Sequence, residues 1–230
     1  PFFASVPFVT TKHSGWWNSR FMIELNNVSV SAGEVPLLRP TTVSVSQAEA
    51  LVIRGHNGSG KSTLLRLLAG ALPPTDGEVL INGSVPDTRS RAFRRTVAAM
   101  IGLPPMSSDL TVRDHVALVS TTWFPRSADA DDVASSVLDK LGLSQLSLRF
   151  PHELSSGQLQ LFGLSLVLAR PFDVLIVDEP EQRLDDERLG IVSHVLQALR
   201  NDGVTVVVAT HSSHLADDLG DRVLSLDVTT

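Results

Sequence analysis

The chain has 230 residues, a formal net charge of −6 and no cysteine. Without cysteine it cannot form a disulfide framework, a Cys-ligated zinc site, an iron–sulfur site or a cysteine nucleophile. Hydrophobic residues make up 43% of the chain and charged residues 19%, which indicates a folded domain rather than a disordered segment. The acidic charge balance argues against a nucleic-acid partner, and no apolar run reaches the roughly 18 residues of a membrane-spanning helix.

Residues 1–21 differ from the rest of the chain. Of the 9 Phe and 3 Trp, six lie in this segment, which shows neither helical nor strand periodicity. A basic n-region and an apolar h-region are both missing, so we do not expect a secretory signal. We interpret the segment as a tail or a non-native extension. The alternative is an arm whose aromatic side chains dock on a partner.

The following residues alternate between strand-like and helix-like patterns. Strands are predicted over residues 22–30, 41–53, 79–82, 174–177, 204–209 and 222–226, with Gly33, Pro36 and Pro40 as turn signals between the first two. Helices are predicted over about 64–68, 109–120, 129–141, 157–170 and 185–201. This alternation predicts an α/β fold with a parallel sheet covered on both faces, interrupted by a helical insertion.

The buried strand near Ile53 runs directly into a glycine-rich loop and then a helix. The segment Gly55-x-x-x-x-Gly60-Lys61-Ser62 matches a phosphate-binding loop. Its glycines allow a tight turn whose N–H groups point at phosphates, at the positive end of the helix dipole. We expect Lys61 to contact the β- and γ-phosphates and Ser62 to bind Mg²⁺. The predicted nucleotide-binding residues of this loop are Gly55, Asn57, Gly58, Ser59, Gly60, Lys61, Ser62 and Thr63.

Two further strand ends carry candidate catalytic side chains. The strand at 174–177 ends in Asp178 and Glu179, and the strand at 204–209 leads to His211. Carboxyl ends of parallel strands face the ligand crevice, so we expect Asp178 to hold Mg²⁺ and Glu179 to polarise the attacking water. His211 is predicted to bond the γ-phosphate. Taken separately, the carboxylates are typical of a solvated turn and the histidine of a structural residue.

The segment Leu154-Ser155-Ser156-Gly157-Gln158 opens the helix before Asp178. It resembles the Leu-Ser-Gly-Gly-Gln signature of the ATP-binding cassette (ABC) family, with Ser156 as a departure. The resemblance implies that two cassettes sandwich two ATP, with Ser155, Gly157 and Gln158 contacting the γ-phosphate bound by the other subunit. It also implies that Glu179 is the catalytic base, that His211 is a switch residue and that Leu184-Asp185 lies at the dimer interface.

The resemblance also sets the expected fold and domain boundaries. It implies a P-loop NTPase core with an N-terminal antiparallel β part, the whole cassette spanning residues 22–230. The core is expected over residues 22–105 and 154–230, and a helical subdomain over 106–153. Catalytic roles are then expected for Lys61, Glu179 and His211, nucleotide contact for Asp185, and Mg²⁺ binding for Ser62 and Asp178.

Two positions depart from the family pattern. Pro105 is aligned with a Gln that binds Mg²⁺ and couples the cassette to its membrane partner, which puts the full hydrolytic rate in question. Ala32 stands where the family stacks the adenine on an aromatic side chain. Losing one stacking platform costs about 1–3 kcal/mol, so we expect ATP to bind with reduced discrimination against GTP.

The function implied is that of an ATP-binding, ATP-hydrolysing subunit that uses ATP and Mg²⁺ to drive a separate membrane permease. It is expected to form a homodimer or a heterodimer with another nucleotide-binding subunit. Its expected location is cytoplasmic, peripheral on the inner face of the cell membrane. One alternative is a regulatory or degenerate cassette with weak ATPase activity. The other is a soluble cassette outside transport, for which the chain lacks a second cassette and a long coiled-coil insertion.

Overall fold

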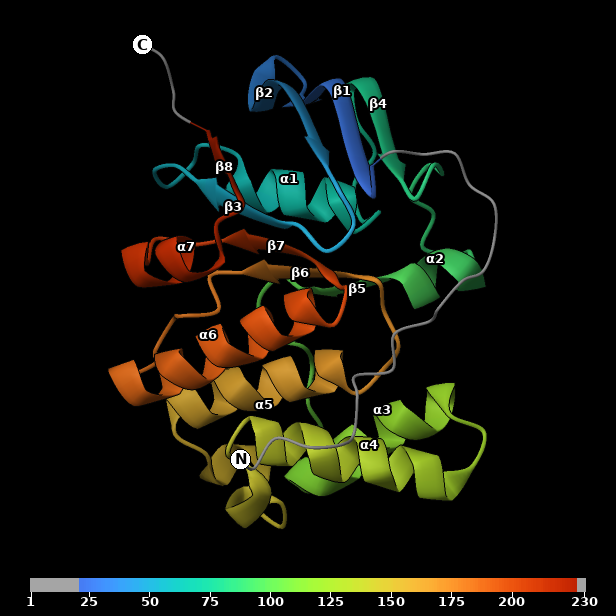
Figure 1. The fold of residues 1–230 in the computed structure, drawn as a ribbon, viewed down its shortest axis with the longest axis vertical. Helices are drawn as coiled ribbons and strands as arrows, with labels where there is room; N and C mark the ends of the chain where they lie inside the picture. The colour runs from blue at the N-terminus through green and yellow to red at the C-terminus, as the bar shows by residue number, and fades with distance from the viewer. Residues whose placement is uncertain (1–20, 227–230) are drawn as a thin grey trace.

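The computed structural model describes residues 21–226 (Figure 1). The tail predicted at residues 1–21 therefore lies outside the described residues, apart from Phe21. The strands are β1 (Ile23–Ala32), β2 (Val35–Val45), β3 (Ala50–Arg54), β4 (Asp76–Ile81), β5 (Val97–Met100), β6 (Val174–Asp178), β7 (Thr205–Ala209) and β8 (Arg222–Ser225). The α-helices are α1 (Lys61–Leu68), α2 (Arg91–Thr96), α3 (Val112–Trp123), α4 (Ser127–Lys140), α5 (Ser156–Leu168), α6 (Asp186–Asn201) and α7 (Ser213–Leu219).

The strands form two sheets. β2, β1 and β4 make a three-stranded antiparallel sheet in that order, and β5, β6, β7, β3 and β8 make a five-stranded sheet. Every neighbouring pair in the second sheet is parallel. Parallel neighbours need crossover connections, and α1, α5, α6 and α7 lie in these connections. The predicted fold class, an α/β P-loop core with an N-terminal antiparallel part, is confirmed.

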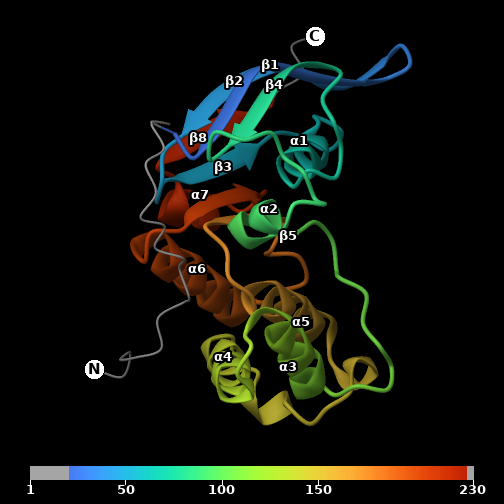
Figure 2. The same ribbon diagram turned by 90° about the vertical axis from the view of Figure 1, so that its right-hand side faces the viewer.

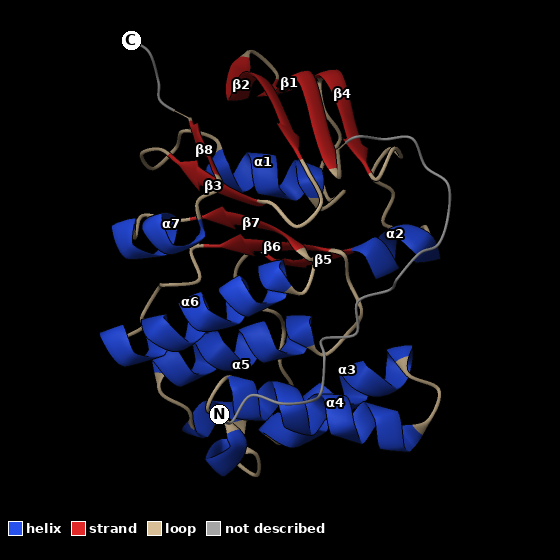
Figure 3. Cartoon of the chain, in the orientation of Figure 1, coloured by secondary structure: helices blue, strands red, loops and turns tan. Residues whose placement is uncertain are grey.

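The elements stack in layers (Figures 1 and 2). The antiparallel sheet, α1, the parallel sheet, the layer of α5 and α6, and the pair α3 and α4 follow one another down the molecule. Figure 3 shows the strands in one half of the molecule and α3 to α6 in the other. One hydrophobic core joins the antiparallel sheet, α1 and one face of the parallel sheet. The second core joins the opposite face to the helices below it.

Helix α5 is the centre of the second core. Its sequence is apolar on every face, and Phe162 within it has no exposed surface. A helix that is hydrophobic all round has to be buried, and α5 packs against β5, α3 and α4. This burial fixes the N-terminal end of α5, where the Leu154–Gln158 segment begins the helix.

One turn assignment was wrong. Pro36 and Pro40 were predicted to interrupt the strands, yet both lie within β2. β2 is an edge strand paired only with β1 among the described strands. Proline has no N–H to donate and is tolerated at a sheet edge. Pro36 pairs opposite Ser31 in this antiparallel ladder.

The short elements α2 and α7 were not predicted because 6 or 7 residues give too little periodicity. Residues 106–153 contain α3 and α4, and α3 begins with a capping box between Thr111 and Asp114. Within residues 21–226, no helix has both the length and the apolarity needed to cross a membrane.

Candidate functional site

The glycine-rich loop lies between β3 and α1, at the carboxyl edge of the parallel sheet. Gly60 caps α1 with φ 99° and ψ 8°, a left-handed conformation that favours glycine. A Cβ atom there would lie 2.7 Å from the Leu37 carbonyl oxygen. The loop is therefore held tightly against β2, with its helix N-terminus directed at the crevice.

Replacing Gly60 with Ala is expected to destabilise the protein strongly, because the new methyl group meets fixed backbone. Gly203 provides a matched control: its φ is 98° and nothing lies within 4 Å of its Cβ position. Gly203→Ala carries only the left-handed strain, about 1–2 kcal/mol. Thermal unfolding of the two nucleotide-free variants is the measurement. Equal melting temperatures would show that the loop yields and that its fit against β2 is loose.

Lys61 is buried at the start of α1, with 6% of its surface exposed. Its Nζ donates to the carbonyl oxygens of Gly55 at 2.9 Å and His56 at 3.2 Å. Both acceptors belong to the loop itself, so the ammonium group crosses the interior of the loop. No carboxylate forms a salt bridge with Lys61 among the described residues, which leaves its positive charge available to a phosphate.

Ser62 and Asp178 are brought together from positions far apart in the chain. Ser62 Oγ donates to Asp178 Oδ2 at 2.6 Å. Burial raises the pKa of the Asp178 carboxyl group, and the Ser62 hydrogen bond partly opposes that rise. The other oxygen, Asp178 Oδ1, is buried and has no hydrogen-bond partner among the described residues. Such an oxygen costs free energy until a cation or donor reaches it.

These oxygens fit a magnesium ion. A hydroxyl and a carboxylate are hard oxygen ligands of the type Mg²⁺ prefers. The described residues contain no cluster of three or more His, Cys, Asp or Glu side chains suited to a metal. A Mg²⁺ ion held by these two side chains would take its other ligands from water and nucleotide phosphates, as is usual for this ion.

Glu179, which follows β6, and His211, which follows β7, lie in contact with each other. His211 Nε2 lies 3.2 Å from Glu179 Oε1, and the second carboxylate oxygen accepts a hydrogen bond from Gln182 Nε2. Glu179 has φ 45°, in the left-handed region, and its N–H donates to the Ala209 carbonyl at 2.8 Å. Strained backbone of this kind is common at functional sites. The predicted proximity of the two strand ends is confirmed.

The signature segment forms the first turn of α5. Ser155 and Gln158 make a capping box. The Ser155 N–H donates to Gln158 Oε1 at 2.9 Å, and the Gln158 N–H donates to Ser155 Oγ at 3.3 Å. A Cβ on Gly157 would lie 2.8 Å from the Arg183 carbonyl oxygen. The signature segment therefore packs directly against the loop that leads to Asp185. Asp185 caps α6 by accepting from Arg188 N at 2.9 Å, and its carboxylate also pairs with the Arg188 guanidinium.

The structure also places Ala32 and Pro105, the two positions that depart from the family pattern. Ala32 ends β1, and Val35 opens β2 across the hairpin with 61% of its surface exposed. β5 ends at Met100, so Ile101 comes directly after the strand, Gly102 is the second residue beyond it and Pro105 the fifth. Neither Gly102 nor Pro105 has a side-chain oxygen, so neither supplies a metal ligand from its side chain.

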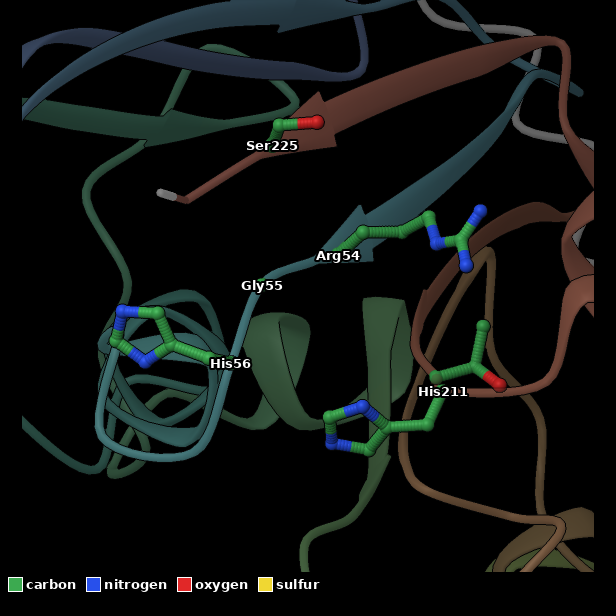
Figure 4. Close-up of a pocket in the computed structure, with 6 residues that line it drawn as sticks. Arg54, Gly55, His56, His211 and Ser225 are labelled. Atoms are coloured by element: carbon green, nitrogen blue, oxygen red, sulfur yellow. The ribbon is translucent and has the colours of Figure 1, made fainter. Parts of the chain in front are cut away.

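A pocket of about 380 Å³ lies beside the loop, lined by Arg54, Gly55, His56, Thr210, His211 and Ser225. In Figure 4, His56 lies on one side of it, and Arg54 and His211 on the other. The sequence interpretation missed Arg54 and His56. A usable signal was present, because both residues flank Gly55 and carry cationic or proton-binding side chains beside a predicted phosphate site.

Comparison with known proteins identifies the family. The ABC transporter family model matches residues 38–182. The chain is 30% identical over 210 residues to the glutamate/aspartate import ATP-binding protein GltL of Escherichia coli K12, covering 90% of this chain and 87% of the relative. Identity to the glutamine transport ATP-binding protein GlnQ of Bacillus subtilis is also 30% over 210 residues, with the same coverage.

Solved structures show the same fold. The ATP-binding subunit of an ABC transporter superposes with a TM-score of 0.79 at 23% identity, covering 89% of this chain and 85% of the other. The dimeric ATP-binding cassette MJ0796, in a post-hydrolysis state bound to ADP and Pi, gives a TM-score of 0.79 at 24% identity, covering 91% and 97%.

The fold and the site together define a P-loop ATPase, with a phosphate loop after β3 and an acidic end on β6, two strands of the parallel sheet that flank β7. The chain belongs to the ABC transporter family and is an ATP-binding, ATP-hydrolysing subunit of that family. The predicted family, the predicted ATPase activity and ATP as the nucleotide are confirmed.

Proposed function

We propose that two cassettes, each with the site of this chain, enclose two MgATP molecules and drive a separate membrane permease. The observation that carries this proposal is the meeting of Ser62 and Asp178, 2.6 Å apart, beside the Glu179–His211 contact. A metal-binding pair and a water-polarising carboxylate are the parts that phosphoryl transfer to water requires. The cassette MJ0796, which shares this fold, is a dimer.

Each part of the site then has a role. The loop N–H groups and Lys61 bind the phosphates, Glu179 accepts the proton of the attacking water, and His211 bonds the γ-phosphate. The other contacts between the glycine-rich loop and the nucleotide are assigned to the loop residues from Gly55 to Thr63 that the sequence analysis names. Ser62 and Asp178 hold Mg²⁺, which supplies charge neutralisation to the β- and γ-phosphates when bound.

The partner cassette completes the site. Ser155 and Gln158 hydrogen-bond each other within their own helix turn, and among the described residues neither side chain has a hydrogen bond to the phosphate loop. The N-terminus of α5 nevertheless presents N–H groups suited to an anion. We assign Ser155, Gly157 and Gln158 to the γ-phosphate held by the other cassette, and Asp185 to the interface between the two cassettes.

Replacing Asp178 with Asn tests the magnesium assignment through two opposite effects. Because burial raises the pKa of Asp178, the folded protein holds this proton more tightly than the unfolded chain. Ionisation therefore costs stability as the pH rises above the ordinary value of 3.8. Asn removes that cost, so the nucleotide-free variant is expected to melt at a higher temperature near pH 7. The same variant is expected to lose the stabilisation that MgATP gives over ATP with EDTA.

Thermal unfolding with ATP, in Mg²⁺ or in EDTA, is the measurement. Ser62→Ala is the matched variant, since it removes the other proposed ligand without changing charge. If Asp178→Asn keeps the full magnesium-dependent shift in melting temperature, the proposed magnesium site is wrong.

A second candidate function is a cassette that binds ATP and hydrolyses it slowly. It is favoured by Gly102 and Pro105, neither of which offers a side-chain ligand to a metal or water. Ala32 and the exposed Val35 leave aliphatic groups for the base, which supports weak discrimination between ATP and GTP. A competition titration measures this discrimination: equal affinity for both nucleotides is expected, and strong preference for ATP would contradict it.

The relatives GltL and GlnQ are named for transport of acidic or amide amino acids. We therefore propose that this chain energises an amino-acid importer from the inner face of the membrane. Leu103, Leu118 and Leu148 expose 37%, 57% and 75% of their surfaces in the segment from β5 to α5 and are proposed to face the permease. Co-expression with an amino-acid permease, followed by measurement of ATP-dependent glutamine or glutamate uptake into vesicles, tests this. Export in place of uptake would contradict it.

A further inference from the structure

Glu181 connects the loop after β6 to the segment that carries His211. The residue is half-buried, two positions after Glu179. Its Oε1 atom accepts three hydrogen bonds: from Thr210 Oγ1 at 2.7 Å, from His211 N at 2.8 Å and from Ser212 N at 3.3 Å. All three donors belong to consecutive residues directly after β7. One carboxylate therefore fixes this short segment to the loop that also carries Glu179.

The arrangement constrains the backbone of His211. Thr210 is 1% exposed, so its hydroxyl has little access to water as a substitute partner. The N–H of His211 cannot change direction without rotating a planar peptide group. The second oxygen, Glu181 Oε2, is buried and has no hydrogen-bond partner among the described residues.

His211 is therefore held at two points by two different carboxylates. Its ring contacts Glu179, which the proposed reaction uses to accept a proton, so that contact has to change during turnover. Its backbone contacts Glu181, which the proposed reaction does not use. The Glu181 contact can persist while the ring exchanges Glu179 for a phosphate.

We propose that Glu181 is a positioning residue for His211, setting the direction of the imidazole toward the γ-phosphate through the His211 backbone. The proposal rests on the proposed role of His211. A displacement of about 1 Å at a catalytic group can lower a rate by as much as 100-fold, so even a loose loop has a measurable effect. The reach of the side chain, rather than its charge, is the property that matters here.

Two substitutions separate reach from charge. Glu181→Gln keeps an oxygen at the same reach, and Glu181→Asp keeps the charge but withdraws the oxygens by one methylene group. Steady-state ATPase measurements are expected to show a kcat for Glu181→Asp and Glu181→Ala lowered by about tenfold, with the KM for ATP within about twofold. Glu181→Gln is expected to retain most of the wild-type kcat. Thermal unfolding and circular dichroism establish that each variant is folded.

The double variant Glu181→Ala/His211→Ala tests the route of the effect. Residues that act as one unit are not additive, so the double variant is expected to be no slower than His211→Ala alone. A wild-type kcat for folded Glu181→Asp, a Gln variant as slow as the Asp variant, or a double variant slower by the product of the single effects would overturn the proposal. If His211→Ala itself turns over at the wild-type rate, the role proposed for His211 fails, and this inference fails with it.

Discussion

Replacing Lys61 with Ala is expected to lower kcat/KM for ATP by at least about 100-fold, the cost of removing one preorganised group from a developing phosphate charge. The ammonium group is buried in the loop and bonded to the carbonyls of Gly55 and His56. A phosphate replaces these carbonyls at small cost because the Lys61 charge is already positioned. The expected loss appears both in nucleotide binding, measured by titration, and in turnover.

Lys61→Arg is the matched variant for this prediction. It keeps a positive charge, but the planar guanidinium is larger than an ammonium group and differs in geometry. We expect it to be nearly as inactive as Lys61→Ala. A Lys61→Arg variant with wild-type ATP affinity would show that the loop needs only charge, and the specific fit described here would be wrong.

Replacing Glu179 with Gln is expected to give the second large effect, a fall in kcat of about 100- to 10,000-fold, the usual contribution of a general base. The side-chain amide still offers an oxygen to His211, whose Nε2 lies 3.2 Å from Glu179 Oε1. The loop is therefore expected to keep its geometry while the base is lost. ATP binding should persist, so the variant should accumulate as an ATP-bound dimer, seen by size-exclusion chromatography with light scattering.

The control for Glu179→Gln is Gln182→Ala, which removes the hydrogen bond from Gln182 Nε2 to Glu179 but leaves the carboxylate in place. It is expected to turn over at a rate similar to the wild type. If wild-type and Glu179→Gln proteins hydrolyse ATP at the same slow rate, the candidate of a slowly hydrolysing cassette is favoured over an efficient ATPase.

Much of the site could be predicted because its residues occupy strand ends. The order Gly55 to Ser62, Asp178, Glu179 and His211 follows three buried strands, and parallel strands bring their carboxyl ends to one edge. This rule needs no side-chain detail. The fold class could also be predicted, because the apolar runs at β6 and β7 are typical of buried strands that pair with other strands inside a parallel sheet.

The rest depends on side-chain geometry that sequence patterns do not carry. Glu181 reads as a polar loop residue, yet its carboxylate accepts three hydrogen bonds from a segment 29 to 31 residues away. Arg54 reads as the end of a strand, yet it lines the pocket beside His211. Pro36 and Pro40 match the sequence pattern of turn residues. They are tolerated in β2 because β2 lies at the edge of its sheet, and the sequence pattern does not give the order of the strands.

The central claim is that each active site combines the phosphate loop of one cassette with the signature segment of another copy of this chain. Mixing two inactive variants tests it directly. Lys61→Ala destroys the phosphate loop only, and Ser155→Arg places a bulky cation on the signature segment only. In a heterodimer of the two, one composite site is intact. For random pairing of equal amounts, we predict recovery of up to about a quarter of wild-type ATPase activity. A mixture no more active than its separate components would contradict the shared-site account.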